Sequence, residues 1–351
     1  MSNETQTSQA KYIIVGAGLS GLTCAYQLLK AGQTNFLILE SRDRTGGRIL
    51  TKEGVDFGAT WFQEHHHYMH QLCDELGVER FAQYSKGQNT LVYSSMAPAH
   101  LFENDPSATP ASRIVSGTSA LIDALSKKLS GKVRLNTKVL SVAETADGLK
   151  VETSTGTYIG AKIVITIPPL IATRIAFTPT LPESLTSAME KTHTWMSNAI
   201  KVGLTFEKPF WRSKNLSGMI IGQVGPVTEL YNHSDFEDKR YALMGFVNEA
   251  LRELTPTERK ERITDYLSKH LGAEVLDYLS YEEKDWSDDW HTSCESIKSL
   301  YLSPKYGNPI FQKAYLNGKM LFAGAETAPT YGGYMDGAIE SGLITAGKLT
   351  R

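Results

Sequence analysis

The chain has 351 residues, of which 41% are hydrophobic and 21% are charged, as in an ordinary soluble globular protein with one or two domains. A formal net charge of −2 gives no general reason to expect nucleic acid or an anionic membrane as a partner. Three widely scattered cysteines do not indicate a disulfide framework, so we expect a reducing, cytoplasmic compartment.

Residues 1–9 are polar and are expected to form a disordered leader, because they lack the apolar region of a signal peptide. No stretch of the chain approaches the roughly 18 apolar residues of a membrane span. We therefore predict no membrane partner.

The first forty residues have the pattern of a βαβ nucleotide-binding unit. Short apolar runs at 12–15 and 36–39 predict two buried strands. Between them, the Gly-rich segment 16–21 opens a helical pattern with leucines on one face. A Gly-x-Gly-x-x-Gly motif alone is weak evidence. Placed between a strand and a helix, with a second strand after the helix, it indicates a dinucleotide-binding unit.

Each glycine of this motif has a physical task. Gly16 is expected to make the tight turn, Gly18 to let the backbone approach a pyrophosphate, and Gly21 to let helix and sheet pack closely. The helix N-terminus offers free N–H groups and a partial positive charge. Glu40, at the end of the second strand, is placed to accept hydrogen bonds from a ribose diol.

A basic segment with two adjacent glycines follows, and small residues recur shortly after it. Guanidinium groups can neutralise an anion there while the glycines allow close approach, so contact with a cofactor is favoured over a solvated loop. The residues concerned are Arg42, Arg44, Gly47, Arg48, Gly58 and Ala59.

The histidine-rich run at 64–70 invites a metal interpretation, because His66 and His70 would share a helical face. It lacks a convincing spacing of three or four ligands, so no metal site is predicted. A hydrated helix start, with one histidine at the rim of a site, is favoured instead.

The rest of the chain indicates an α/β protein with two domains. A β-meander is predicted at 133–142, 149–153 and 158–161, followed by an apolar strand at 163–167. A helix is predicted at 257–271, and a last strand at 319–324 leads into a Gly-rich helix start at 331–338. A Rossmann-like domain assembled from discontinuous segments is predicted from 10–80, 112–190 and 290–351. A smaller mixed α+β substrate-binding domain is predicted from 81–111 and 191–289.

Taken together, these residues resemble the flavin-dependent amine oxidases, of which the monoamine oxidases are the best-known members. The resemblance covers nearly the whole length, and its C-terminal block is highly specific. Its blocks are 16–21 with Glu40, 44–48 with 58–59, 200–201 with 210–212, 281–286, and 322–327 with 333–338.

The resemblance implies FAD rather than NAD as cofactor. Val139 would meet the adenine through its backbone, Met335 would lie at the isoalloxazine, and Lys201 would contact flavin N5 through a water. The implied cofactor-binding residues are Gly16, Gly18, Gly21, Glu40, Arg42, Arg44, Gly47, Arg48, Gly58, Ala59, Val139, Trp286, Gly324, Glu326, Gly333, Tyr334, Met335 and Ala338.

The implied reaction is oxidation of an amine to an imine by hydride transfer to flavin N5. Hydrolysis of the imine then gives an aldehyde or ketone, and reoxidation by O2 gives H2O2. The implied catalytic residues are Lys201, with Tyr334 and Trp61 as aromatic walls. An apolar, aromatic site would favour the neutral amine that this chemistry requires.

Two departures from the family pattern bear on the site. Cys294 stands one position early for the family's flavin-linking cysteine, and Glu295 replaces a cage tyrosine, so FAD is predicted to be non-covalent. Glu295 is a candidate for binding a cationic end of the substrate. The segment between Gly58 and Val115 is short, which predicts a reduced cavity roof, either open or completed by another subunit of a homo-oligomer.

The sequence is also compatible with other functions. A flavoprotein desaturase of the protoporphyrinogen or carotenoid type shares several blocks, although Lys201 and Tyr334 weigh against it. A flavin-binding partner protein with little turnover is the alternative outside enzymes. An NAD(P)-linked dehydrogenase is the least favoured. The substrate could be a primary amine, polyamine, amino acid or alkaloid.

Overall fold

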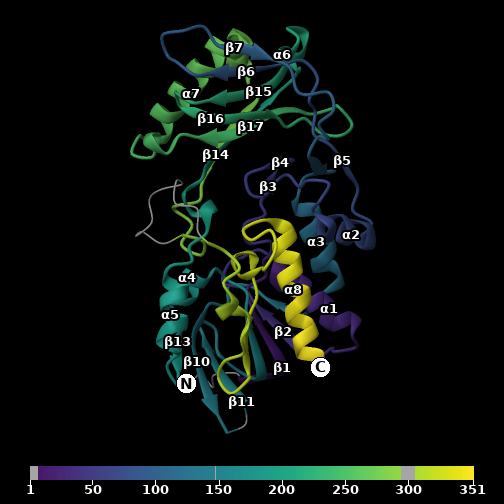
Figure 1. Cartoon of the computed structure of the whole chain (residues 1–351), viewed down its shortest axis with the longest axis vertical. Coiled ribbons are helices and arrows are strands. Elements are labelled where there is room, and N and C mark those ends of the chain that lie inside the picture. Colours follow the sequence, from purple (N-terminus) through teal and green to yellow (C-terminus); the bar gives the residue numbers. More distant parts are fainter. Residues whose placement is uncertain (1–6, 147, 294–304) are drawn as a thin grey trace, which may run out of the picture.

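The computed structural model describes residues 7–146, 148–293 and 305–351. It is an elongated molecule with two parts, each built around one large sheet (Figure 1). The lower part in Figure 1 contains β1 and α1, and the upper part contains β14 to β17.

The lower sheet combines parallel strands with an antiparallel meander. Within the described residues its order is β13-β10-β11-β12-β1-β2-β9, and β19 also pairs with β12. The strands are β1 (Thr7–Val15), β2 (Phe36–Leu39), β9 (Val133–Arg134), β10 (Val139–Thr145), β11 (Gly148–Thr153), β12 (Thr157–Ile165), β13 (Ala176–Thr178) and β19 (Met320–Phe322).

Strand β12 joins the meander to the parallel part of this sheet. Its first half pairs antiparallel with β11, its second half pairs parallel with β19, and its other edge pairs parallel with β1. Two expected strands at 158–161 and 163–167 are therefore one continuous strand. The expected strand at 133–142 is instead two, because β9 crosses to pair with β2 while β10 starts the meander.

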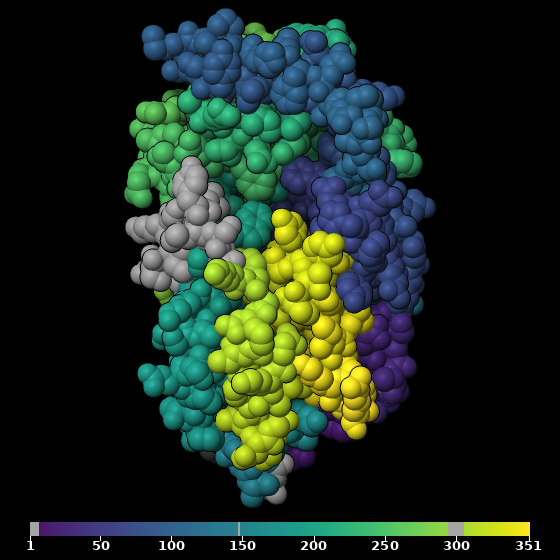
Figure 2. All heavy atoms as spheres, in the orientation of Figure 1, coloured from purple at the N-terminus to yellow at the C-terminus, as the bar shows by residue number. Residues whose placement is uncertain are grey.

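Helices pack on this sheet from both ends of the sequence. The first and last long helices, α1 (Leu19–Lys30) and α8 (Met335–Thr350), lie against each other so closely that a Cβ on Gly342 would stand 2.6 Å from the Ser20 carbonyl oxygen. The C-terminal segment, in yellow, forms much of one face of the lower part (Figure 2). The other helices of this part are α2 (His67–Leu76), α3 (Ser119–Lys128), α4 (Pro169–Ala172) and α5 (Glu183–Glu190).

The upper sheet has the order β18-β14-β17-β16-β15-β6-β7. Its strands are β6 (Gln88–Val92), β7 (His100–Phe102), β14 (Ile200–Phe206), β15 (Leu216–Gly222), β16 (Val227–Asn232), β17 (Tyr241–Val247) and β18 (Ser280–Asp285). The segment 81–111 thus contributes strands beside those of 191–289. Two small sheets pair β3 (Thr51–Lys52) with β4 (Val55–Asp56), and β5 (Arg80–Ala82) with β8 (Ser112–Ile114).

Helix α7 (Pro256–Leu271) packs on one face of the upper sheet through Ile263, Leu267 and Leu271. It begins with a capping box, since Thr255 accepts from the Glu258 backbone N–H and Glu258 accepts from that of Thr255. A shorter helix, α6 (Phe210–Ser213), precedes β15. No helix in the described ranges is long and apolar enough to cross a membrane.

Candidate functional site

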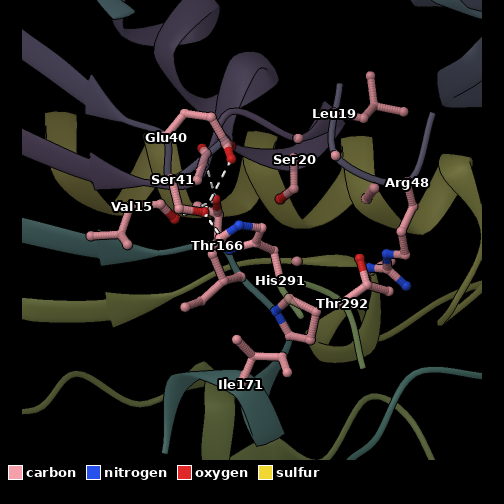
Figure 3. Close-up of a pocket in the computed structure, with 18 of the residues that line it drawn as sticks. Val15, Leu19, Ser20, Glu40, Ser41, Arg48, Thr166, Ile171, His291 and Thr292 are labelled. Carbon is pink, nitrogen blue, oxygen red and sulfur yellow. Dashed lines mark hydrogen bonds between the residues drawn. The ribbon is translucent and has the colours of Figure 1, made fainter. Parts of the chain in front are cut away.

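A cavity lies at the carboxyl ends of the parallel strands β1, β2 and β12, the edge where open α/β sheets bind ligands. Figure 3 shows how side chains from distant segments converge on it. The lining residues fall within 15–20, 39–49, 137–139, 166–175, 195–196, 290–292, 324–325 and 333–338, with Ala59.

The glycine motif forms one wall, and its three glycines differ in what surrounds them. Gly16 has a φ of +107°, which favours glycine, and a Cβ there would stand 2.8 Å from Thr166 Oγ1. A Cβ on Gly21 would stand 2.1 Å from the Gly16 carbonyl oxygen. A Cβ on Gly18 would meet nothing within 4 Å, so this glycine leaves open space at the cavity wall.

The N-terminus of α1 faces the cavity with unused hydrogen-bonding capacity. The first N–H groups of a helix have no intrahelical partner. Ser20 lines the cavity, and its hydroxyl is buried without a hydrogen-bond partner among the described residues. Together with the open space at Gly18, these donors fit an anionic group such as a pyrophosphate.

Glu40 is held at the end of β2 by the chain around it. Its carboxylate accepts hydrogen bonds from the backbone N–H of Ala17 at 2.7 Å and of Arg42 at 2.9 Å, and from Ser41 Oγ at 3.3 Å. Ser41 Oγ also lies 3.0 Å from His291 Nδ1. A carboxylate has about four acceptor positions, so Glu40 retains room for one more donor such as a ribose hydroxyl.

The three arginines predicted at this site have different neighbours. Arg42 lines the cavity and donates to Asp289 at 2.7 Å and to Thr292 at 2.8 Å. Arg44 instead donates to three carbonyl oxygens of its own loop, including that of Gly47 at 2.8 Å, and does not line the cavity. It braces the loop.

Arg48 lines the cavity and is paired with a residue from the far end of the chain. Its guanidinium donates to both carboxylate oxygens of Glu326, at 2.5 and 3.0 Å, and to Thr194 Oγ1 at 2.5 Å. Burial alone would lower the pKa of Arg48, but the Glu326 carboxylate more than offsets this and raises it. Glu326 is 1% exposed and lies behind Arg48 rather than on the cavity wall.

Lys201 lies on β14, just beyond the cavity wall. Its Nζ donates to the Gly58 carbonyl oxygen at 2.7 Å and to Thr60 Oγ1 at 3.0 Å, on either side of the cavity residue Ala59. Burial, opposed in part by Asp56, lowers the pKa of the Lys201 amine to about 7. Near neutral pH this side chain can therefore hold or release a proton.

One of the two predicted aromatic walls, Tyr334, lines the cavity, and the other, Trp61, does not. Tyr334 lines the cavity and is 55% exposed, and the His66 ring lies 5.5 Å from it and 4.9 Å from Tyr331. Burial lowers the pKa of His66 to about 4, so its imidazole is neutral at physiological pH. Trp61 is turned toward the upper sheet, with its ring 4.7 Å from that of Tyr231.

The structure brings most of the predicted cofactor residues to one cavity. Those on its wall are Gly16, Gly18, Glu40, Arg42, Gly47, Arg48, Ala59, Val139, Gly324, Gly333, Tyr334, Met335 and Ala338. The predicted cofactor residues off its wall are Gly21, Arg44, Gly58, Trp286 and Glu326. The predicted catalytic residues Lys201 and Trp61 also lie off the wall.

Trp286, which was predicted as a cofactor residue, is buried in the core and does not line the cavity. It is 0% exposed, packs with Met196 and Ala199, and donates from Nε1 to the Phe57 carbonyl oxygen at 2.7 Å. It supports the wall from behind, through Met196, instead of lining it. Cys294 and Glu295 lie outside the described residues.

Several lining residues carry no signal in the sequence. Trp195 and Met196 belong to a 3-10 turn (Trp195–Asn198) that only tertiary packing brings to the cavity. Trp290 and His291 likewise arrive from a loop. Thr166 could have been inferred, because it follows a parallel strand at the edge where ligands bind.

The described residues contain no group of three or more His, Cys, Asp and Glu side chains placed to hold a metal ion. His66 is instead the N-cap residue of α2, with its Nδ1 accepting from the Gln63 backbone N–H at 3.1 Å.

Known proteins resemble this chain in sequence along nearly its full length. A probable flavin-containing monoamine oxidase A of Dictyostelium discoideum is 26% identical over 451 aligned residues, which cover 96% of each chain. The flavin-containing amine oxidase B of Sus scrofa is 25% identical over 98% of this chain and 86% of its own. The first alignment is a hundred positions longer than this 351-residue chain, so the relative carries segments that this chain lacks.

Solved structures share the fold. Wild-type putrescine oxidase bound to putrescine superposes with a TM-score of 0.84 at 23% identity, covering 97% of this chain and 99% of that chain. Cyclohexylamine oxidase from Brevibacterium oxydans IH-35A gives a TM-score of 0.84 at 18% identity, covering 97% and 98%.

The sequence profile of one family, described as flavin containing amine oxidoreductase, matches residues 19–107 and 89–350. These matches extend over most of the chain, from the first helix of the nucleotide-binding unit to the end of α8. The chain belongs to the flavin containing amine oxidoreductase family.

Proposed function

We propose that the protein oxidises an amine to an imine with FAD as the electron acceptor, and that the imine is hydrolysed to an aldehyde or ketone. The observation that carries the proposal is the junction between the cavity and Lys201. Ala59 lines the cavity, while its neighbours Gly58 and Thr60 hold the Lys201 amine.

The residues of the cavity fit FAD along its length. The N-terminus of α1 and Ser20 would bind the pyrophosphate, Glu40 would accept from the adenosine ribose, and Val139 would lie at the adenine. Gly333 and Met335, at the start of α8, would lie near the flavin ring. When bound, the flavin would supply the redox chemistry, namely acceptance of a hydride from the carbon next to the amine nitrogen and delivery of two electrons, together with two protons, to O2 to give H2O2.

The remaining roles fall to the protein. Tyr334, on the cavity wall, would pack beside the amine and, with Trp61 on the side of the upper sheet, would favour its neutral form, whose lone pair stabilises the developing imine. Lys201 would hold a proton at Nζ beside residues 58–60. Because the pKa of its amine is about 7, this proton can exchange near neutral pH. Such a site needs no separate acid–base triad.

Non-covalent attachment of FAD is part of the proposal. The two cysteines within the described residues, Cys24 and Cys73, are buried in the core, and burial raises the pKa of their thiols to about 12 and about 11. Neither lines the cavity. Denaturing the holoenzyme and finding the flavin in the ultrafiltrate tests this; flavin that stays with the polypeptide would contradict it.

The function is tested by mixing the purified holoenzyme anaerobically with primary, secondary and polyamine substrates while recording flavin absorbance. We expect bleaching by at least one amine class, and stoichiometric H2O2 when air is readmitted. A flavin that stays oxidised with every amine would overturn the proposal.

A further inference from the structure

A second set of buried polar groups lies beside Lys201, at the junction of the two parts of the molecule. At its centre is Asp56 on β4, in the small hairpin between the lower and upper parts (Figure 1). Asp56 is 1% exposed and does not line the cavity. The proposed amine oxidation gives this carboxylate no role, although burial of a charge is costly unless other groups compensate for it.

Neutral hydrogen-bond donors hold the Asp56 carboxylate. It accepts from Thr51 Oγ1 at 2.6 Å, from the Thr118 backbone N–H at 2.9 Å and from Thr118 Oγ1 at 3.2 Å. Burial alone would raise the pKa of Asp56, but its neighbours His233, Thr51 and Thr118 lower that pKa. Asp56 therefore carries a negative charge at neutral pH.

His233 touches Asp56 without neutralising it. Its Nε2 accepts a hydrogen bond from the Asp56 backbone N–H at 3.1 Å, so this nitrogen carries no proton. Burial lowers the pKa of His233 to about 4, so the imidazole is neutral at physiological pH. The imidazole nitrogen 3.4 Å from the carboxylate consequently leaves the charge of Asp56 uncancelled.

Two threonines connect Asp56 with Lys201. Thr118 Oγ1, which donates to Asp56, also lies 3.4 Å from the Thr60 carbonyl oxygen. Thr60 Oγ1 in turn accepts from Lys201 Nζ at 3.0 Å. Thr60 is 3% exposed, Thr118 0% and Lys201 1%. Little water therefore screens the attraction between the Asp56 carboxylate and the Lys201 amine.

Charged side chains from four elements surround Lys201, namely Asp56 on β4, Arg113 on β8, Glu229 on β16 and Lys284 on β18. Burial lowers the pKa of the Lys201 amine, Asp56 is the strongest influence against burial, and Arg113 reinforces burial. Glu229 acts in the same direction as Asp56 but more weakly. Lys284 is paired with Asp289, 3.6 Å away.

We propose that Asp56 is a positioning residue for Lys201, whose buried charge keeps a share of the Lys201 amines protonated at neutral pH while the cofactor is reoxidised. Asp56 does not touch the cavity and acts only through the Lys201 ammonium beside residues 58–60. Without this carboxylate, burial and Arg113 would leave the amine neutral. The inference rests on the proposed amine oxidation with FAD and adds a residue to it.

The first measurement is the titration of the Lys201 amine, followed by NMR of holoenzyme that contains isotope-labelled lysine. The signal that is missing from Lys201→Met identifies this amine. We expect a midpoint near pH 7 in the wild type. In Asp56→Asn, which keeps the size of the side chain and removes its charge, the midpoint should fall by about one pH unit. Arg113→Gln, which removes the opposing charge, should raise it.

Thr51→Val is the matched control, because it removes a hydrogen-bond donor of the same carboxylate and leaves the charge in place. Its midpoint should stay within about 0.3 pH units of the wild type. An unchanged midpoint in Asp56→Asn, or an equal shift in Thr51→Val, would overturn the inference. If Asp56→Asn does not fold, an unchanged midpoint in Arg113→Gln would overturn it instead, because the buried charges of this cluster would then not act on Lys201.

The second measurement links this titration to the reaction. Holoenzyme reduced with dithionite, which needs no amine, is mixed with O2 over a range of pH, and the rate of flavin reoxidation is recorded. The pH profile of this rate should move with the NMR midpoint in Asp56→Asn. A midpoint that moves while the profile stays would overturn the role of Asp56 in reoxidation. If no amine reduces the flavin, the proposed function fails, and the NMR titration still shows whether Asp56 holds the proton on Lys201.

Discussion

The amine of Lys201 has a pKa that burial lowers strongly, and this shift links its ionisation to the stability of the protein. Its side chain is buried, and desolvation lowers the pKa of its amine from 10.5 to about 7. In the unfolded chain the pKa returns to about 10.4. Between these values the unfolded state binds a proton that the folded state has released, so stability must rise with pH across this window. Below pH 7 the cost of burying the ammonium is fully present.

We predict that the wild type gains on the order of 3 kcal/mol of unfolding free energy relative to Lys201→Met as pH rises from 7 to 10. Chemical denaturation at a series of pH values measures this difference. The same variant should also reoxidise its flavin at least tenfold more slowly in stopped-flow mixing with O2, because it lacks the protonable group beside 58–60.

Lys208→Met is the control, since it removes an exposed lysine two residues beyond the same strand. Parallel pH curves for wild type and Lys201→Met would contradict the buried titration. Equal reoxidation rates would make Lys201 a packing residue.

The sequence predicted Lys201 but could not predict that the Thr60 hydroxyl binds its amine. Lys201 stands between apolar residues in an alternating run and in a block that resembles the family, so both local pattern and resemblance point to it. Thr60 becomes a partner of Lys201 only through tertiary packing of segments that lie 141 residues apart in the chain. No spacing along the chain contains that information.

At the scale of one element, two glycines of the same motif have different roles: one is required for packing and the other borders the cavity. Gly21 has no room for a Cβ, since one would stand 2.1 Å from the Gly16 carbonyl oxygen. Gly18 has an ordinary φ of −75°, lines the cavity, and has no atom within 4 Å of where a Cβ would stand.

We therefore predict that Gly18→Ala folds with an apoprotein Tm close to that of the wild type but binds FAD at least tenfold more weakly. Gly21→Ala should lose about 1–3 kcal/mol of stability, because overpacking strains the junction of β1 and α1. Thermal unfolding of the apoproteins and titration with FAD, followed by flavin fluorescence, separate the two effects. Equal FAD affinities for Gly18→Ala and wild type would mean that the pyrophosphate of FAD does not bind beside Gly18.

Elements with a strong local pattern were predictable from the sequence. The βαβ unit, the capped helix α7 and the strand before α8 all form as expected, because apolar periodicity and capping residues act within a few turns of chain. The division of 133–142 into β9 and β10 was not predictable, since β9 is defined by its partner β2. The sequence around Trp286 does not distinguish a residue that lines a cavity from one that packs behind the cavity wall.

At the scale of the whole molecule, the pair of Arg48 and Glu326 joins segments 278 residues apart across the wall of the cavity. We predict that Glu326→Gln loses about 2–3 kcal/mol of stability, because it leaves the Arg48 guanidinium without its counter-ion. The exposed pair of Glu237 and Lys239 provides the control, and Glu237→Gln should change stability little. Chemical denaturation of both variants makes the comparison.

Partial recovery in an Arg48→Met, Glu326→Gln double variant would identify the uncompensated charge as the cause. A double variant whose loss equals the sum of the two single losses would contradict this interpretation.

The membership of the chain in an amine-oxidising flavoprotein family was predictable from its blocks of sequence, and the family match confirms it. The mixed α/β fold is likewise confirmed by structures that share it.

The pairing of α1 with α8, and of β12 with β19, has a consequence for biosynthesis. While the ribosome is still making the middle of the chain, the nucleotide-binding unit has emerged without the helix and strand that later cover it. Its apolar surface remains exposed until residues 320–350 have been synthesised. Contacts of such long sequence separation form slowly. Nascent chains should accordingly depend on chaperones until α8 has emerged from the ribosome, and FAD added to stalled chains that lack α8 should not be retained.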